Sequence, residues 1–439
     1  MVGHGRHRGR RTTRILGISL TAVLAGVLVL TSPSHAPIRL AASGSAVQGR
    51  APGAKESLDP ADVENLQQSR PDEVAAEWRA IPVAQRADAA QTLPTALGNL
   101  DGLPFGLRDK LNRRALKEAT DEARRKLATR PSDTETRRSL QAYTAISIAL
   151  KPTKPRRQLI TLTADQPPLA AISVGDLDAA DLVTWQVPGM GTYTTDMALW
   201  TLAAANLHAA QGASGAPRAR AVIAWMGYVP PPPPPSIEAS RGVYVLAGAP
   251  NLIRDVSAVN AVRPGGRRKL HMNIVAHSYG TTVAANALAS ADLGIDAFVM
   301  LASAGVEPGI GNASALHAQH VYAGEARRDG LADFGRLSRI DPSAPTFGAT
   351  LFGVDGVRSA RLAAVTGHEP ILHSAWNDNP RSSIWTRITD VVQRLLRYRE
   401  HKQRFGYLDR GTESLANTAC ATTPGATRQM TGLRTAAGR

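Results

Sequence analysis

The sequence predicts an α/β protein in which a mostly parallel sheet has flanking helices and is preceded by a helical N-terminal region. Two observations support this prediction. From residue 156 onward, short apolar runs alternate with helical stretches, as in successive βαβ units. Between residues 51 and 155, apolar residues recur at helical spacing instead. With 439 residues the chain is long enough for two or three domains.

The helical region, residues 51–155, has a clear helix start at Pro71. Acidic residues follow it in the first turn, where the helix dipole favours them. We expect a second helix around residues 107–116 and a third that starts at Pro131. Because this region shows no catalytic pattern, we interpret it as a packing or lid domain.

The α/β domain is expected to extend over residues 156–410. Strands are predicted near residues 157–163, 169–174, 182–187, 220–227, 271–277, 296–302, 319–323 and 361–365, and helices near 195–211, 250–262, 280–290 and 382–400. Six consecutive prolines, residues 230–235, predict a stiff surface loop, with recruitment of a partner as the alternative. Residues 411–439 lack periodicity and are predicted to form a disordered tail that contains Cys420.

The composition excludes several classes of protein. Hydrophobic residues make up 43% and charged residues 20% of the chain, so it is neither wholly disordered nor a polytopic membrane protein. A single cysteine excludes an internal disulfide framework and a metal centre built from cysteines. Nothing in the pattern implies a metal ion or an organic cofactor.

The net charge of +15 is concentrated at the two ends of the chain. The first 14 residues contribute +5 and residues 381–439 contribute +7, which leaves +3 for the residues between them. Because no nucleic-acid-binding motif accompanies this charge, we expect no nucleic-acid partner. Basic ends on a near-neutral body are more typical of a membrane-topology signal, and of a solvated helix or a contact with an anionic surface.

The N-terminal end has the pattern of an export signal. Five arginines precede an apolar run, residues 15–30, which as a helix would span about 24 Å, slightly less than a bilayer core. Small residues that suit a cleavage site follow at 34–36 and 44–46. We therefore assign residues 1–50 to an export signal or membrane anchor plus a linker. We expect a secreted or cell-surface protein, with membrane contact through the apolar run if it is retained.

Ser278 lies at the junction of a predicted strand and a predicted helix. A serine at the apex of a sharp strand-to-helix turn forms a nucleophile elbow, whose strained backbone requires small residues two positions before and two after the serine. Ala276 and Gly280 meet this requirement. A second such sequence surrounds Ser173, but no helix follows it. We therefore assign Ser173 to a strand and Ser278 as the candidate nucleophile.

A serine hydroxyl needs a base, and the base needs an acid that orients it. In folds with a nucleophile elbow, the acid and then a histidine follow the serine along the chain. Asp329 is the favoured acid because it lies in the loop after the strand predicted at 319–323. Glu325 and Asp333 are alternatives, and an ion pair with neighbouring arginines is the non-catalytic interpretation of Asp329.

Two histidines follow the last predicted strand. His373 is the favoured base, because a small residue follows it, Trp376 lies nearby to wall the site, and the terminal helix comes next. His368 is the alternative, with a solvated loop position as its non-catalytic interpretation. His277 adjoins the serine, but its side chain should point away from Ser278, so we predict a structural role for it.

The tetrahedral intermediate of an acyl transfer needs hydrogen-bond donors for its oxyanion. The backbone N–H of Tyr279, next to the serine, is one candidate. A second donor is expected from the loop after the strand predicted at 182–187, where glycines let the backbone approach a substrate closely. The N–H of Met190 is favoured there and that of Gly191 is the alternative. The same glycines would suit a phosphate-binding loop, but no Lys-Ser/Thr pair follows them.

Eight short motifs lie between about residues 70 and 400: Leu100-Asp101-Gly102-Leu103-Pro104, Arg108-Asp109, Asn112-Arg113, Gly175-Asp176-Leu177-Asp178, Val187-Pro188-Gly189-Met190-Gly191-Thr192, Trp225-Met226-Gly227-Tyr228, His277-Ser278-Tyr279-Gly280 and Phe347-Gly348-Ala349. In these motifs the chain resembles an actinobacterial alpha/beta-hydrolase family catalogued as a domain of unknown function. The resemblance implies an alpha/beta-hydrolase fold, with Ser278 as nucleophile and His373-Ser374 at the position of the base. The family pattern is Gly-His-Ser at both the elbow and the base, where this chain has Ala276 and Leu372 before the histidines.

These features predict an exported or cell-surface serine hydrolase. It would cleave an ester or related acyl bond of a small-molecule or lipid substrate through Ser278, Asp329 and His373. The alternative is a catalytically degenerate hydrolase fold that acts as a binding or scaffolding protein.

Overall fold

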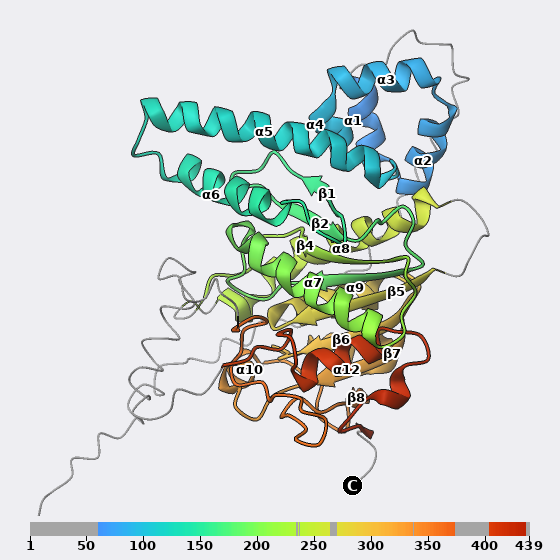
Figure 1. The fold of residues 1–439 in the computed structure, drawn as a ribbon, viewed down its shortest axis with the longest axis vertical. Coiled ribbons are helices and arrows are strands. Elements are labelled where there is room, and N and C mark those ends of the chain that lie inside the picture. Colours follow the sequence, from blue (N-terminus) through green and yellow to red (C-terminus); the bar gives the residue numbers. More distant parts are fainter. Residues whose placement is uncertain are drawn as a thin grey trace, which may run out of the picture. The chain divides into compact units, whose positions relative to one another are not determined.

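A mostly parallel sheet forms the centre of the α/β region (Figure 1). The computed structural model describes residues 60–233, 236, 238–263, 270–336, 338–373 and 404–435. In these residues the strand order is β1-β2-β4-β3-β5-β6-β7-β8-β9. All neighbours from β4 to β8 pair in parallel, whereas β2 and β9 run antiparallel to their neighbours. The strands are β1 Arg157–Leu162, β2 Ala170–Val174, β3 Leu182–Val187, β4 Arg220–Met226, β5 His271–His277, β6 Ile295–Leu301, β7 Ala318–Gly324, β8 Thr350–Leu351 and β9 Arg434–Thr435.

Helices cover both faces of this sheet. On one face lie α7 (Met197–Ala213) and α12 (Glu413–Ala421); on the other lie α8 (Val243–Val262) and α9 (Tyr279–Ser290). The strands supply side chains to both faces in alternation, because successive side chains of a strand point to opposite sides. In β4, for example, Val222 joins the apolar cluster under α7, and Ile223 joins the cluster under α8 and α9. The short helix α10 (Gly330–Gly335) follows β7.

The helical region lies beside β1, which is at one end of the strand order, with β8 and β9 at the other (Figure 1). Its helices are α1 Pro60–Gln68, α2 Pro71–Ala80, α3 Val83–Thr92, α4 Pro94–Gly98, α5 Phe105–Thr129 and α6 Thr134–Ala149. It has a small apolar core of its own, which includes Trp78, Leu100 and Leu111. In addition, α5 packs on β1, α2 on α8, and α6 on α7. We call the helical region the cap. Part of its apolar surface packs on the α/β region.

Two buried carboxylates of the cap, Asp101 and Asp109, bond to the α/β region. Arg108 of α5 donates to Asp101 at 2.7 Å, and both residues are almost fully buried. The second oxygen of Asp101 accepts from Arg254 of α8 at 2.8 Å. Asp109 in turn accepts from the backbone N–H of Leu159 in β1 at 2.8 Å. The motifs around residues 100–113 thus form the joint between cap and sheet.

Most of the elements expected from the sequence are present. Seven of the predicted strands match β1–β7, Ser173 lies in β2 as predicted, and the mostly parallel sheet confirms the predicted fold class. The strand predicted at 361–365 is wrong, because only isolated bridges form there, including Val357 with Leu362. Residues 1–50 and the helix predicted at 382–400 lie outside the described residues.

The disordered tail predicted for residues 411–439 is corrected by α12. Thr412 caps this helix by accepting from the N–H of Leu415, and eight of its nine residues are buried. Cys420 lies inside this helix, 3.6 Å from the hydroxyl of Ser214. Although α12 is buried on nearly every side, it is built mostly of small and polar residues, and Leu415 is its one large apolar residue.

Within the described residues, none of the helices is both long enough and apolar enough to cross a bilayer.

Candidate active site

The β5–α9 junction has the geometry of a nucleophile elbow. Ser278 follows β5 directly and has φ 53° and ψ −126°, a backbone conformation that is rare outside glycine. Its N–H donates to the carbonyl of Leu301 in β6 at 2.9 Å, which holds the turn in place. A Cβ on Gly280 would lie 2.5 Å from the backbone oxygens of Val187 and Pro188, so the helix can start this close to β3 only with glycine there.

His368 is the partner of Ser278. Its Nε2 lies 2.9 Å from Ser278 Oγ, and its Nδ1 lies 2.9 Å from both carboxylate oxygens of Asp329. We call this arrangement the Ser278–His368–Asp329 series. A base within hydrogen-bond reach of the hydroxyl, oriented by a carboxylate, is the arrangement that activates a serine.

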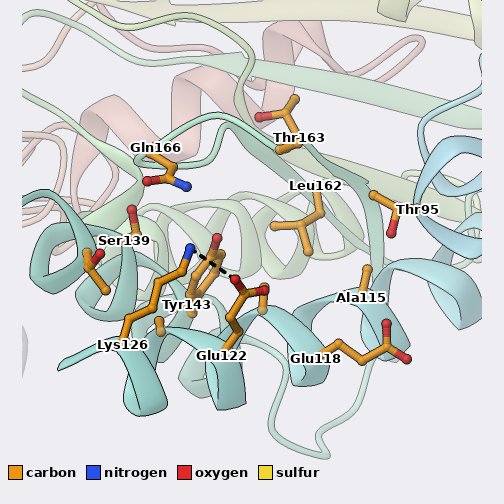
Figure 2. A pocket seen from close by; sticks show the side chains of 14 residues that line it. Thr95, Ala115, Glu118, Glu122, Lys126, Ser139, Tyr143, Leu162, Thr163 and Gln166 are labelled. Atoms are coloured by element: carbon orange, nitrogen blue, oxygen red, sulfur yellow. Dashed lines mark ion pairs between the residues drawn. The ribbon is translucent and has the colours of Figure 1, made fainter. Parts of the chain in front are cut away.

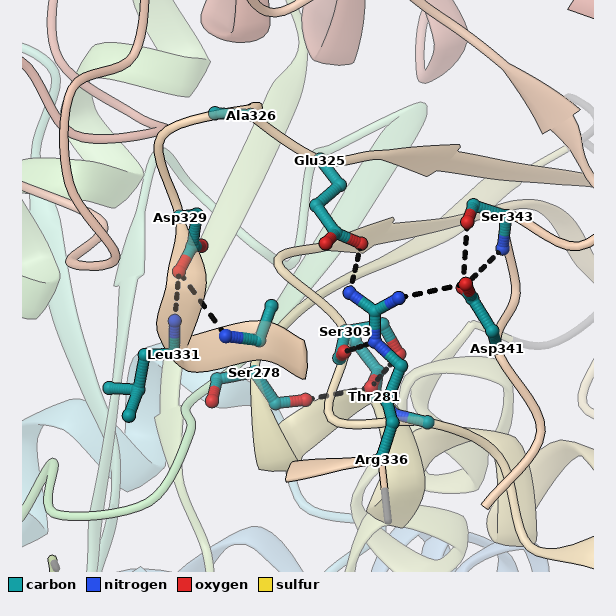
Figure 3. A network of polar contacts seen from close by, with 12 residues as sticks. Ser278, Thr281, Ser303, Glu325, Ala326, Asp329, Leu331, Arg336, Asp341 and Ser343 are labelled. Atoms are coloured by element: carbon teal, nitrogen blue, oxygen red, sulfur yellow. Dashed lines mark hydrogen bonds and ion pairs between the residues drawn. The ribbon is translucent and has the colours of Figure 1, made fainter. Parts of the chain in front are cut away.

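Asp329 is held by donors on several sides. It lies in the loop between β7 and α10, as the sequence predicts. One carboxylate oxygen accepts from the hydroxyl of Tyr407 at 2.8 Å. The other accepts from the N–H groups of Leu331 at 3.2 Å and Ala332 at 3.3 Å, and Figure 3 shows these two bonds. These bonds fix the carboxylate that faces His368. Tyr407 was not found from the sequence.

His373, the base that the sequence favours, is not part of this series, and the prediction is corrected to His368. Asp409 accepts from the backbone N–H groups of Leu372 and His373, each at 2.7 Å, and holds this part of the loop in a turn. The His373 side chain is exposed and its ring lies 5.0 Å from that of Phe405. One signal for His368 was present in the sequence, since Gly367 precedes it as glycine precedes the base in the resembled family.

The rival acids lie elsewhere. Glu325 forms an ion pair with Arg336, which also binds Asp341 at 2.8 Å and donates to the carbonyl of Ser303 at 3.1 Å (Figure 3). This network joins the loops after β6 and β7. Asp333 lies in α10, one turn after Asp329. Asp329 is therefore the acid that the structure brings to the histidine.

The electrostatics of the series favour a charged pair. Burial acts to raise the pKa of Asp329, but the charge of His368 and the hydrogen bonds from His368 and Tyr407 outweigh it and lower that pKa to about 2. Burial acts to lower the pKa of His368, yet the charge and hydrogen bond of Asp329 raise it above its ordinary value of 6.5. The acid thus stays ionised, and the histidine becomes a stronger base.

The N–H of Tyr279 and the loop that carries the N–H of Met190 lie next to Ser278. The N–H of Tyr279 begins α9, and the loop of Gly189 and Met190 approaches so closely that a Cβ on Gly189 would lie 2.6 Å from Ser278 Cβ. Within the part of the chain described, no acceptor is found for the N–H of Tyr279 or Met190. Both predicted donors are therefore available. Gly191, the alternative, is not, because its N–H donates to the carbonyl of Pro231 at 3.0 Å.

Two further contacts hold the loop of Met190, and sequence reasoning missed both. The hydroxyl of Tyr228 donates to the carbonyl of Pro188 at 2.6 Å. The bond from Gly191 to Pro231 attaches the loop to the start of the proline run, where Pro230 and Pro231 are buried rather than exposed. This part of the predicted surface loop is therefore a support of the site.

A separate cavity of about 270 Å³ lies in the cap between α5, α6 and the loop after β1 (Figure 2). Its walls carry Tyr143, Gln166 and an ion pair between Lys126 and Glu122 at 2.9 Å. No histidine or cysteine lines it. Because β1 is four strands from β5, roughly 19 Å away, this cavity is not part of the site at Ser278. Among the described residues, no cluster of His, Cys, Asp and Glu has the makeup of a metal site.

Comparison with known proteins agrees with the fold. Residues 164–339 match the model of a protein family described as alpha/beta hydrolase, and this range includes Ser278 and Asp329. The match confirms the resemblance inferred from the motifs. Together with the sheet order, the match identifies the α/β region as an alpha/beta-hydrolase fold, which the helical N-terminal region precedes. No match was found among curated proteins.

Several solved hydrolases are distantly similar. An esterase from the archaeon Pyrobaculum calidifontis has 16% identity over 61% of this chain and 95% of its own, with a TM-score of 0.34. A dienelactone hydrolase from Anabaena variabilis has 15% identity over 42% of this chain and 79% of its own, with a TM-score of 0.29. A putative dienelactone hydrolase from Klebsiella pneumoniae has 17% identity over 52% of this chain and 91% of its own, with a TM-score of 0.28.

Proposed function

We propose that the protein is a serine hydrolase that cleaves an ester or a related acyl bond. The observation that carries the proposal is the 2.9 Å contact between Ser278 Oγ and His368 Nε2, continued on the other side of the ring to Asp329. The strained elbow and the two unengaged N–H groups beside the serine support it.

The proposed reaction begins with acylation. His368 Nε2 takes the hydroxyl proton as Ser278 Oγ attacks the substrate carbonyl carbon, and the carbonyl electrons move onto the oxygen. The N–H groups of Tyr279 and Met190 stabilise that oxyanion. When the tetrahedral intermediate collapses, its bond to the leaving oxygen breaks and His368 gives its proton to that oxygen. The alcohol departs and an acyl-serine remains.

Deacylation repeats these steps with water. His368 takes a proton from the water as the water oxygen attacks the acyl carbon, and the oxyanion again forms beside Tyr279 and Met190. Collapse then breaks the bond to Ser278 Oγ, and His368 returns the proton to the serine. Asp329 orients the imidazole and stabilises its charged form throughout. The net reaction consumes one water and gives an acid and an alcohol.

An apolar acyl group suits the surroundings of the site. Five large apolar side chains are strongly exposed in the described residues, and three of them are Val229, Val243 and Leu246. Val229 follows Tyr228, which bonds to the loop of Met190. Val243 and Leu246 lie in the first turns of α8, which packs on Tyr228 through Gly248. We therefore expect p-nitrophenyl octanoate to be cleaved with a higher kcat/KM than p-nitrophenyl acetate.

We also propose that the enzyme acts outside the cytoplasm, on the basis of the basic and apolar N-terminal pattern. Fractionation of cells that express the full chain, beside a variant without residues 15–30, tests this. We expect the full chain outside the cytoplasm and the variant inside it. The same location for both would contradict the proposal.

The reaction itself is tested with a fluorophosphonate probe, which reacts with activated serines. The full-length chain should be labelled, and Ser278→Ala and His368→Ala should not. His373→Ala is the matched control, because it removes a nearby histidine that does not contact the serine, and it should be labelled like the parent. A folded parent that resists the probe would favour a degenerate fold that binds a partner.

A further inference from the structure

His277, the last residue of β5, is bonded to the residue that carries the proposed base. It is 4% exposed, and its Nε2 lies 2.6 Å from the backbone carbonyl oxygen of His368. Since a carbonyl oxygen only accepts, His277 Nε2 carries the proton of this bond. The other ring nitrogen, Nδ1, then has a lone pair, and it is buried without a partner in the described residues.

Burying His277 Nδ1 without a partner costs free energy, and the bond from Nε2 to His368 is the contact that could offset this cost. Burial and the neighbouring charge of His368 lower the pKa of His277 to about 3, so the ring is neutral at ordinary pH. A buried acceptor without a donor is unfavourable, and an apolar side chain of similar size would avoid it. The gain from a histidine at this position is therefore the bond that Nε2 makes.

We propose that His277 is a positioning residue that holds the main chain of His368, so that its ring lies between Ser278 and Asp329. This inference rests on the proposed hydrolase function. Ser278 and His277 are consecutive, so the end of β5 holds the hydroxyl and, through Nε2, the base. His368 is 90 residues from Ser278 along the chain and 91 from His277, so both contacts hold the same distant loop at the end of β5.

The surroundings of the ring support a positioning role. The rings of His277 and His368 lie 5.0 Å apart, and that of Tyr407 lies 5.9 Å from His277. The loop of Met190 is also close, because a Cβ on Gly189 would lie 3.3 Å from His277 Nδ1. His277 therefore packs between the base, the support of the acid and the loop of Met190. Among the described residues, its ring nitrogens form no hydrogen bond to Ser278 Oγ or to the ring of His368.

The test compares two substitutions of His277 in the full-length chain. His277→Leu fills the space without a donor, whereas His277→Gln can place an N–H near the position of Nε2. We expect the rate of fluorophosphonate labelling to fall by about 10- to 100-fold in His277→Leu, because small displacements of a catalytic group have effects of this size. His277→Gln should stay within about threefold of the parent, since the donor is retained.

His208→Leu is the matched control. His208 of α7 is another buried histidine, 8% exposed, and burial lowers its pKa to about 4, but it is not part of the site. Its replacement should leave the labelling rate unchanged, and the Tm of each variant separates loss of fold from loss of positioning. Parent-like labelling of His277→Leu, or equal slowing of the Leu and Gln variants at equal Tm, would overturn the proposal.

A second readout does not depend on turnover. The proton between His368 Nδ1 and Asp329 should give a far-downfield NMR signal in the parent and in His277→Gln, and a broadened or absent one in His277→Leu. If the parent resists the probe but these signals differ as expected, the hydrolase function fails and the positioning role stands. If the signal is the same in all three proteins, the positioning role fails.

Discussion

Two aspartates, one in the cap and one beside the proposed nucleophile, are equally buried and differ in their partners. Asp101 and Asp329 are each 4% exposed. Asp101 accepts from two arginines, Arg108 and Arg254. Asp329 accepts from Tyr407 and from His368. Burial alone therefore does not mark a carboxylate as part of an active site.

The difference lies in what the partner can do with a proton. Arginine stays protonated in proteins, so neither partner of Asp101 can release a proton, and these pairs serve to join α5 and α8. Histidine can take up and release a proton near neutral pH. A buried carboxylate on a histidine that reaches a serine can therefore support chemistry, whereas one between arginines supports only the fold.

The largest expected effect comes from neutralising the two aspartates in turn. Asp329→Asn should lower kcat by about 10⁴-fold, because the amide neither stabilises the imidazolium nor fixes the tautomer of His368. Asp101→Asn should instead lower the free energy of unfolding by about 3–5 kcal/mol, because it leaves Arg108 buried without its counter-charge. Ester hydrolysis assays and urea unfolding of both variants measure this. Similar changes in kcat and in the free energy of unfolding for the two variants would contradict the different roles of the two aspartates.

The pH dependence of activity should also separate the two regions. The proposed mechanism needs neutral His368, so kcat/KM should rise with pH through a pKa above the ordinary 6.5, since Asp329 raises it. Asp329 itself stays ionised down to about pH 2. Asp329→Asn should move the midpoint of the profile to lower pH, whereas an Asp101 substitution should leave it in place. Profiles of kcat/KM from pH 5 to 9 test this, and an unmoved midpoint in Asp329→Asn would contradict the assignment.

A smaller effect is expected from Tyr407→Phe. The hydroxyl of Tyr407 donates to Asp329 and accepts from the N–H of Ala326 at 2.9 Å, so its removal leaves one donor buried and weakens the hold on the acid. We expect a loss of about 1–2 kcal/mol in the free energy of unfolding. A decrease of roughly tenfold in kcat should accompany it, as expected for the loss of about 1.4 kcal/mol in the transition state. Unchanged kcat would show that the N–H groups of the α10 turn suffice to hold Asp329.

The smallest effect is expected at His373. Its backbone N–H, not its side chain, makes the bond to Asp409, so His373→Ala should change kcat/KM by less than about twofold. The same ester assay measures it. A loss as large as that of His368→Ala would restore His373 as the base.

The sequence alone determined the parts of this protein that depend on neighbours in the chain. Strand β5, the turn at Ser278 and the start of α9 are consecutive, and small residues at 276 and 280 mark the strained turn. Asp329 was predictable for a similar reason, because it lies in the loop that follows β7. Three of the six helices of the cap, α2, α5 and α6, were predicted from their start signals and apolar spacing, and the first seven strands from their apolar runs.

Tertiary structure decided which distant groups meet these parts. His368 and His373 lie five residues apart in one loop, and the bonds of residues 372 and 373 to Asp409 decide which of them faces the serine. Tyr407 reaches Asp329 across 78 residues of chain. Helix α12 has one large apolar residue, Leu415, and is nevertheless buried, because it packs on α7 and β6. In each case the deciding contact joins segments far apart in sequence, and no local propensity or spacing encodes such a contact.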